Sequence, residues 1–233
     1  MSRRILTFVF AAFAISAWIG AANGALINVQ FGSNSYSGAA VIGAGGDDWN
    51  LITTHTGTAS LTDVTGAATG VTMDSSSAGI GTLIGHGGPF DPPNQYANLF
   101  GGQATAFTSG TQINIVLENL APGPYDLYLI SACNFPGGPQ SRSLAVTANG
   151  VGPVTIGPNN GATTIQVNTN YRVLHPIVGL DGMLTIIGSG ASADEGNLNG
   201  FQLQSVPEPG ALMLLISGVL GLVRLRRRYA IGN

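Results

Sequence analysis

The stretch TQINIVLENLAPGPYDLYLIS, residues 111–131, contains two short apolar segments separated by a turn rich in proline and glycine. In 111–118 apolar residues alternate with polar ones, which is typical of a strand with one face in a core. The segment 125–131 is apolar at nearly every position, which favours a central strand with both faces covered. Proline fixes φ and glycine permits positive φ, so residues 119–125 are predicted to turn, and so is the similar stretch 148–153.

The same strand pattern recurs on both sides of this stretch. Further strands are predicted at 26–31, 143–148, 163–168, 183–187 and 200–204. In the last of these, Phe201 and Leu203 are expected to face the core, and Gln202 and Gln204 the solvent. Short strands without intervening helices indicate an antiparallel sandwich or barrel. The chain is therefore predicted to be all-β, with a single antiparallel β-sandwich over residues 25–205 whose first and last strands lie close together.

The first 24 residues have the three parts of a secretory signal peptide. Arg3 and Arg4 precede an apolar run over 5–19, and Ala22 and Gly24 place small residues before a predicted cut at Ala25. We therefore expect an N-terminal signal helix that is removed on export. A permanent N-terminal anchor is the alternative, and the shortness of the apolar run counts against it.

The chain ends with a proline-containing motif, an apolar run and a basic cluster. These are Val206-Pro207-Glu208-Pro209, the run 210–223, and the arginines Arg224, Arg226, Arg227 and Arg228. In this order the features resemble the PEP-CTERM sorting signal of Gram-negative bacteria. The resemblance implies a C-terminal transmembrane helix, passage through the inner membrane, and cleavage near Pro-Glu-Pro by exosortase, a Cys-protease-like transpeptidase. The cell surface or the extracellular matrix would be the destination. A plain C-terminal membrane anchor is the alternative.

The composition of residues 25–205 excludes one class of partner. That range contains ten acidic residues and two arginines, and the chain contains no lysine. Nucleic acid is excluded because phosphate binding requires clustered basic side chains. Carboxylates are compatible with a structural calcium ion, and we expect no other cofactor. The single cysteine, Cys133, permits no disulfide within the chain and is interpreted as a buried thiol.

Three segments of the body resemble the galactose-binding-like jelly rolls of malectin-type and carbohydrate-binding modules. They are INVQF (27–31), LAPGPYDLYL (120–129) and GNLNGFQL (196–203). The resemblance implies a jelly-roll sandwich that binds sugars through loops at one end and often holds a structural calcium ion. Extracellular polysaccharide is therefore an expected partner.

Two long loops, 32–50 and 85–102, carry the candidate ligand-binding residues. The first ends in Asp47, Asp48, Trp49 and Asn50, where the indole could stack on a sugar and the polar groups could bond its hydroxyls. In the alternative interpretation, Trp49 seals the core and Asp47 caps a turn. A second candidate rim consists of Asp91, Asn94 and Tyr96.

The sequence contains no catalytic motif of the nucleophile-elbow, HExxH or P-loop kind. His55, His86 and His175 are scattered and are interpreted as ordinary loop or strand residues. We therefore predict a non-catalytic surface or matrix protein. A secreted hydrolase acting on glycans is the alternative, and it would need two carboxylates about 5–10 Å apart.

Overall fold

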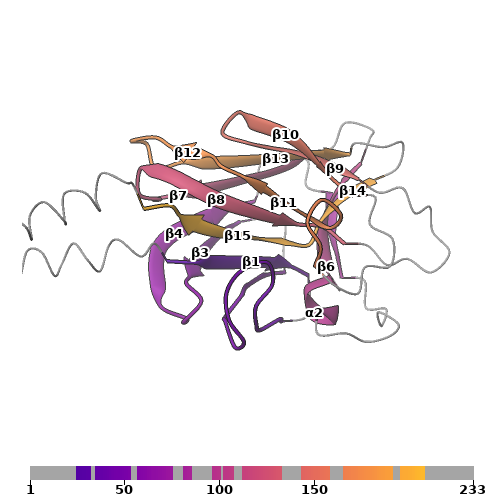
Figure 1. Cartoon of the computed structure of the whole chain (residues 1–233), viewed down its shortest axis with the longest axis horizontal. Helices are drawn as coiled ribbons and strands as arrows, with labels where there is room; N and C mark the ends of the chain where they lie inside the picture. Colours follow the sequence, from indigo (N-terminus) through magenta and orange to yellow (C-terminus); the bar gives the residue numbers. More distant parts are fainter. Residues whose placement is uncertain are drawn as a thin grey trace, which may run out of the picture. The chain divides into compact units, whose positions relative to one another are not determined.

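In the computed structural model, the body of the chain is built almost entirely of strands (Figure 1). Residues 25–32, 35–53, 57–75, 81–85, 96–100, 102–107, 112–132, 143–157, 165–190 and 195–207 are described. Ala25–Gln204 forms one compact unit. Within the described ranges no helix is long and apolar enough to cross a membrane. The predicted signal helix and the predicted transmembrane helix over 210–223 lie outside those ranges.

The first sheet contains the first and last strands of the body. Its strands are β1 (Ile27–Phe31), β2 (Asn50–Ile52), β8 (Gly123–Ile130), β11 (Tyr171–Leu174) and β15 (Gly200–Ser205). They are arranged in the order β11-β8-β15-β1-β2, and the short β12 (Ile177–Val178) pairs with β8.

The second sheet lies against the first across the core. Its strands are β3 (Thr58–Thr62), β4 (Ala68–Asp74), β7 (Ile113–Glu118), β9 (Leu144–Ala148), β10 (Val151–Ile156) and β13 (Leu184–Gly190). Their order is β10-β9-β13-β7-β4-β3. A third sheet, in the order β14-β6-β5, comprises β5 (Gly81–Gly85), β6 (Gly102–Phe107) and β14 (Glu195–Leu198), and a short helix α2 (Ala97–Phe100) precedes β6.

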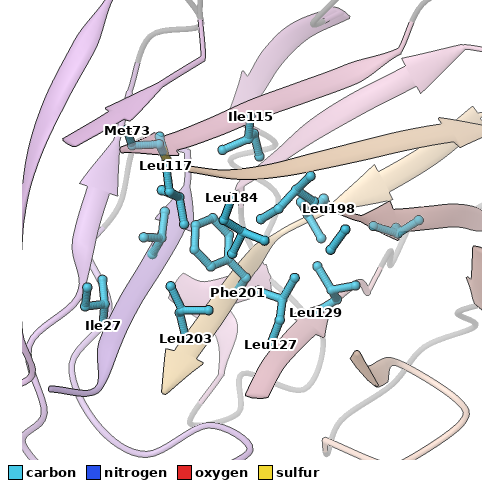
Figure 2. Packing of buried hydrophobic residues seen from close by; sticks show 14 of the residues in the cluster. Ile27, Met73, Ile115, Leu117, Leu127, Leu129, Leu184, Leu198, Phe201 and Leu203 are labelled. Carbon is cyan, nitrogen blue, oxygen red and sulfur yellow. The ribbon is translucent and has the colours of Figure 1, made fainter. Parts of the chain in front are cut away.

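The core is formed by alternate residues of the two six-stranded sheets (Figure 2). Ile115 and Leu117 of β7 are fully buried, as are Leu127 and Leu129 of β8. Phe201 of β15 packs among them at the centre of the cluster. This period of two confirms the sandwich that the alternating pattern predicted.

The stretch 111–131 folds as two strands, and they belong to different sheets. β7 is in the second sheet and β8 in the first, so the turn between them carries the chain across the sandwich. β8 is a central strand, as predicted, with β11 on one side and β15 on the other. Its outward residues Asp126 and Tyr128 are only half-buried, so the prediction that both faces are covered is half wrong.

The first and last strands pair directly, which confirms the prediction that they lie close together. β1 and β15 are antiparallel, with Ile27 opposite Leu203. They approach closely at Gly200, where an added Cβ would lie 2.3 Å from the carbonyl oxygen of Val29. The sheet is not purely antiparallel, because β2 runs parallel to β1 after the loop that joins them.

Two local predictions need correction. The described part of 163–168 is not a strand, since Val167 makes an isolated bridge and Asn168, with φ 64°, begins a turn. The strand starts instead at Tyr171. At 148–153, predicted as a turn throughout, only Asn149 and Gly150 turn, with φ 45° and 78°. This left-handed pair is typical of a tight hairpin, and it joins β9 to β10.

Candidate functional site

The loop between β1 and β2 covers the outer face of the first sheet. The loop is bound to the sheet by the amide side chain of Gln202 on β15, and this side chain is fully buried. The Gln202 Oε1 atom accepts hydrogen bonds from the backbone N–H of Val41 at 2.8 Å and of Ile42 at 3.0 Å. Its Nε2 donates to Asn28 Oδ1 at 2.8 Å and to the Ile42 carbonyl at 3.0 Å. The prediction that Gln202 faces solvent is wrong, because this loop lies over it.

Two polar residues of β1 fix the rest of the same loop. Gln30 Oε1 accepts a hydrogen bond from the Tyr36 N–H at 2.7 Å. Asn28 Nδ2 donates to the carbonyl of Asp48 at 3.2 Å. Asn28 and Gln30 are both fully buried, although they point away from the sandwich core. Buried amides of this kind must be paired, so the loop is part of the folded unit.

The candidate residues Asp47, Asp48 and Asn50 take part in this local architecture. Asp47 Oδ2 accepts a hydrogen bond from the Ala44 N–H at 2.8 Å, which closes a turn. The Asp48 N–H donates to the carbonyl of Val64 at 2.9 Å. Asn50 Nδ2 donates to the Thr62 carbonyl at 2.8 Å, and its Oδ1 accepts from the Thr62 N–H at 2.8 Å. These contacts favour structural roles, and ligand binding by the three residues stays a prediction.

Trp49 belongs to a small aromatic cluster under the loop. It is 8 % exposed, and its Nε1 donates to the Gly38 carbonyl at 2.8 Å. Its ring meets the edge of Tyr36 with centroids 5.4 Å apart, and Tyr36 in turn lies 6.2 Å from Tyr96. Leu99 and Ile130 complete the buried part. These contacts favour the interpretation of Trp49 as a core-sealing residue, and little of its ring is available for stacking on a sugar.

The aromatic cluster brings together residues from both predicted rims. Tyr96 was assigned to the second rim and Trp49 to the first, and Tyr36 contacts both. Burial raises the pKa of Tyr36 above its usual value of 10.0, and the neighbouring Tyr96 adds to the rise. Of the three rings, Tyr96 is only half-buried. Asp91 and Asn94 lie outside the described residues.

A second polar cluster, which sequence reasoning missed, lies on the outer face of the first sheet. His175 Nδ1 is 2.7 Å from Asp126 Oδ1, and the histidine side chain is 73 % exposed. Burial raises the pKa of Tyr128, as do the negative charge of Asp126 and the proximity of Tyr171. Asp126 and Tyr128 alternate along β8, so the strand pattern could have placed them on one face. It could not show that His175, 49 residues away, joins them.

The described residues were also considered as ligands for a metal ion. Within those ranges, no group of three or more His, Cys, Asp or Glu residues is placed to hold one. Calcium also binds carbonyl oxygens, so a structural calcium ion stays a prediction.

The sorting segment begins at the end of the last strand. β15 ends at Ser205, and the next two residues, Val206 and Pro207, are exposed. Glu208, Pro209 and the arginines at 224–228 lie outside the described residues.

Residues 205–228 match the profile of a known family, the PEP-CTERM protein-sorting motif. This chain carries a PEP-CTERM sorting motif. The match confirms the resemblance found in the sequence, and the motif indicates an exported protein that an exosortase recognises.

Comparisons of the whole body with known proteins are weaker. A search of curated protein sequences found no match. Among solved structures, the ANX2 ectodomain from Arabidopsis thaliana is similar with a TM-score of 0.48 and 12 % identity, over 80 % of this chain and 50 % of that one. The carbohydrate-binding module CBM35 from Cellvibrio japonicus Abf62 has a TM-score of 0.35 and 20 % identity, over 58 % of this chain and 94 % of the module.

An exo-β-1,3-galactanase from Phanerochaete chrysosporium is also similar, with a TM-score of 0.35 and 15 % identity. The alignment covers 54 % of this chain and 26 % of the galactanase. All three scores lie below 0.5, so we draw nothing from them about ligand or activity.

Proposed function

We propose that this chain is the precursor of a non-catalytic surface or extracellular-matrix protein of a Gram-negative bacterium. An exosortase-like transpeptidase cuts it near Pro207-Glu208-Pro209 after transient insertion in the inner membrane. The observation that carries the proposal is the PEP-CTERM motif, whose first matched residue, Ser205, is also the last residue of β15. The β-sandwich is then released as the exported body.

The chemistry of the tail supports this sequence of events. Pro207 and Pro209 favour an extended peptide, which is the conformation that a protease cleft accepts. The apolar run 210–223 would be about 21 Å long as a helix, shorter than a hydrocarbon core of about 30 Å. Snorkelling arginines and local thinning can compensate, and the arginine cluster keeps the end of the chain in the cytoplasm.

Substitution within the motif tests processing directly. In a producing cell, the double variant Pro207→Ala/Glu208→Ala should accumulate as uncut precursor in the membrane fraction. Glu118→Ala, which changes an exposed glutamate at the end of β7, should be processed normally. Immunoblots of membrane and surface fractions measure both, and equal processing of the two variants would contradict the proposal.

We further propose polysaccharide as the extracellular partner, contacted through the aromatic cluster at its exposed side. The half-buried ring of Tyr96 and the exposed polar side chains of Ser35, Ser37 and Asp48 in the covering loop support this assignment, because sugar sites combine an aromatic face with hydrogen-bonding groups. A glycan array with residues 25–207, with and without calcium, tests it. Binding without turnover that Tyr96→Ala weakens and Tyr128→Ala preserves is the expected result. Release of reducing ends would establish the hydrolase instead, and absence of binding would leave a structural matrix protein.

A further inference from the structure

Exposed aliphatic side chains gather on β12 and on the turn that joins it to β13. Leu180 is 96 % exposed, Ile177 is 69 % exposed and Met183 is 38 % exposed. The turn is not loose, because the side chain of Asn149 donates to the carbonyls of Ile177 and Met183 at 3.1 and 3.0 Å. Single exposed apolar residues need no explanation. Three of them held together by Asn149 on one strand and the turn after it, one almost completely exposed, indicate a surface that contacts something apolar.

The strand registers place this turn at the end of the sandwich where the chain leaves for its tail. Ile177 pairs with Pro124, at the start of β8. The far end of β8 lies beside the start of β15, since the Asn199 N–H donates to the Ile130 carbonyl at 2.9 Å. The start of β8 therefore lies beside the end of β15, which is Ser205. β12 and the tip of β15 can be followed to the same end of the sandwich in Figure 1.

The length of the chain between β15 and the apolar run limits how far this end of the sandwich can lie from the membrane. Only residues 206–209 separate Ser205 from the apolar run that starts at Gly210. The five steps from Ser205 to Gly210 span at most about 18 Å even when fully extended. While the run is inserted in a bilayer, the end of β15 must stay within roughly this distance of the membrane. The short tether also gives a high effective concentration of the turn at the lipid surface.

We propose that Ile177, Leu180 and Met183 form a membrane-contacting surface that enters the headgroup region of the inner membrane while the precursor is uncut. This proposal rests on the proposed function, because the tail must first be inserted. Burial of exposed aliphatic side chains at the interface is favourable. Asp181 lies within the turn, and its Oδ1 accepts a hydrogen bond from the Met183 N–H at 3.3 Å. A carboxylate does not enter hydrocarbon, so the contact is confined to the headgroup level.

The charges at this end favour neutral lipid contact over electrostatic binding. Within the described ranges the one arginine is Arg172 on β11. It pairs with Leu129, toward the opposite end of β8 from Pro124. Because Asp181 lies in the turn and the described arginine lies toward the other end, the surface should bind zwitterionic bilayers at least as well as anionic ones. Its effect is to hold the body against the membrane, which positions Pro207 beside a membrane-embedded protease.

Fluorescent labelling of the full-length precursor in phosphatidylcholine vesicles tests the proposal. All variants carry Cys133→Ser and one new cysteine labelled with NBD, a dye whose emission shifts to the blue in apolar surroundings. The test site is Leu180→Cys. The matched control is Val167→Cys, an aliphatic residue that is 57 % exposed and lies just before β11, at the opposite end. Ser217→Cys, within the apolar run, reports whether the tail is inserted.

We expect blue-shifted emission and quenching by doxyl-labelled lipid at positions 180 and 217, but not at 167. Ile177→Asn should reduce the quenching at position 180. If 217 is quenched and 180 behaves like 167, the membrane-contacting surface is refuted and the sorting tail stands. If 217 is not quenched either, membrane insertion itself, and with it the proposed function, fails. Equal quenching at 167 and 180 would show insertion driven by the dye and would also overturn the proposal.

Discussion

Replacement of the buried Gln202 by alanine should lower the free energy of unfolding of the body much more than the same replacement at the half-buried Gln204. The side chain makes four hydrogen bonds, and three of them go to the backbone of Val41 and Ile42 in the covering loop. Each such bond contributes about 1 kcal/mol net, so their loss sums to about 4 kcal/mol. Water can reach the half-buried loop backbone and restore part of this. The expected decrease in the free energy of unfolding is therefore about 2–3 kcal/mol.

Urea denaturation of residues 25–207 measures this decrease, and thermal melting should show a midpoint about 5–10 °C lower. Gln204→Ala is the matched control, because Gln204 lies two residues further along β15, on the same face, and is half-buried. We expect it to change stability by no more than about 0.5 kcal/mol. Hydrogen exchange gives a local readout, since the amides of Val41 and Ile42 should lose protection in Gln202→Ala. Equal stability of the two variants would refute the view that Gln202 holds the loop.

Three further outcomes are expected. Gly200→Ala should destabilise the pairing of the first and last strands by about 1–3 kcal/mol in urea melts, because an added Cβ collides with backbone. Gly45→Ala, with nothing within 4 Å of the new atom, should be neutral. Asn149→Gly keeps the left-handed backbone but loses three side-chain hydrogen bonds, so it should cost about 1–2 kcal/mol, and a neutral result would contradict the contacts. Burial raises the pKa of Tyr125 above 10.0, so folding stability should fall as the pH rises above about 10, and Tyr125→Phe should reduce that fall in pH-dependent melts.

The alternation of apolar residues was sufficient to predict the strands of the core. β7, β8 and β15 lie close to where the pattern placed them, because the inward positions of each are buried. The pattern could not assign strands to sheets. The turn between β7 and β8 looks like a hairpin connection in sequence, but it crosses the sandwich, and its path depends on pairings with distant strands.

The candidate site shows where sequence reasoning stops. Gln202 has the polar character of a solvent-facing strand residue, and only the loop over it, 160 residues earlier in the chain, makes it a buried anchor. The contact of Tyr36 with Trp49 and Tyr96 likewise depends on loop packing that residue order does not record. The tail could be predicted because its chemistry is contained in consecutive residues, and the family match at 205–228 confirms it.

Mass spectrometry of the surface-exposed protein tests the central claim most directly. The account predicts a mature chain that begins at Ala25 and ends close to Pro207-Glu208-Pro209. Peptides from the apolar run 210–223 and from the arginine cluster should be absent from that fraction and present in the membrane precursor. An exported protein that still contains an intact peptide from Arg224 to Asn233 would contradict the account.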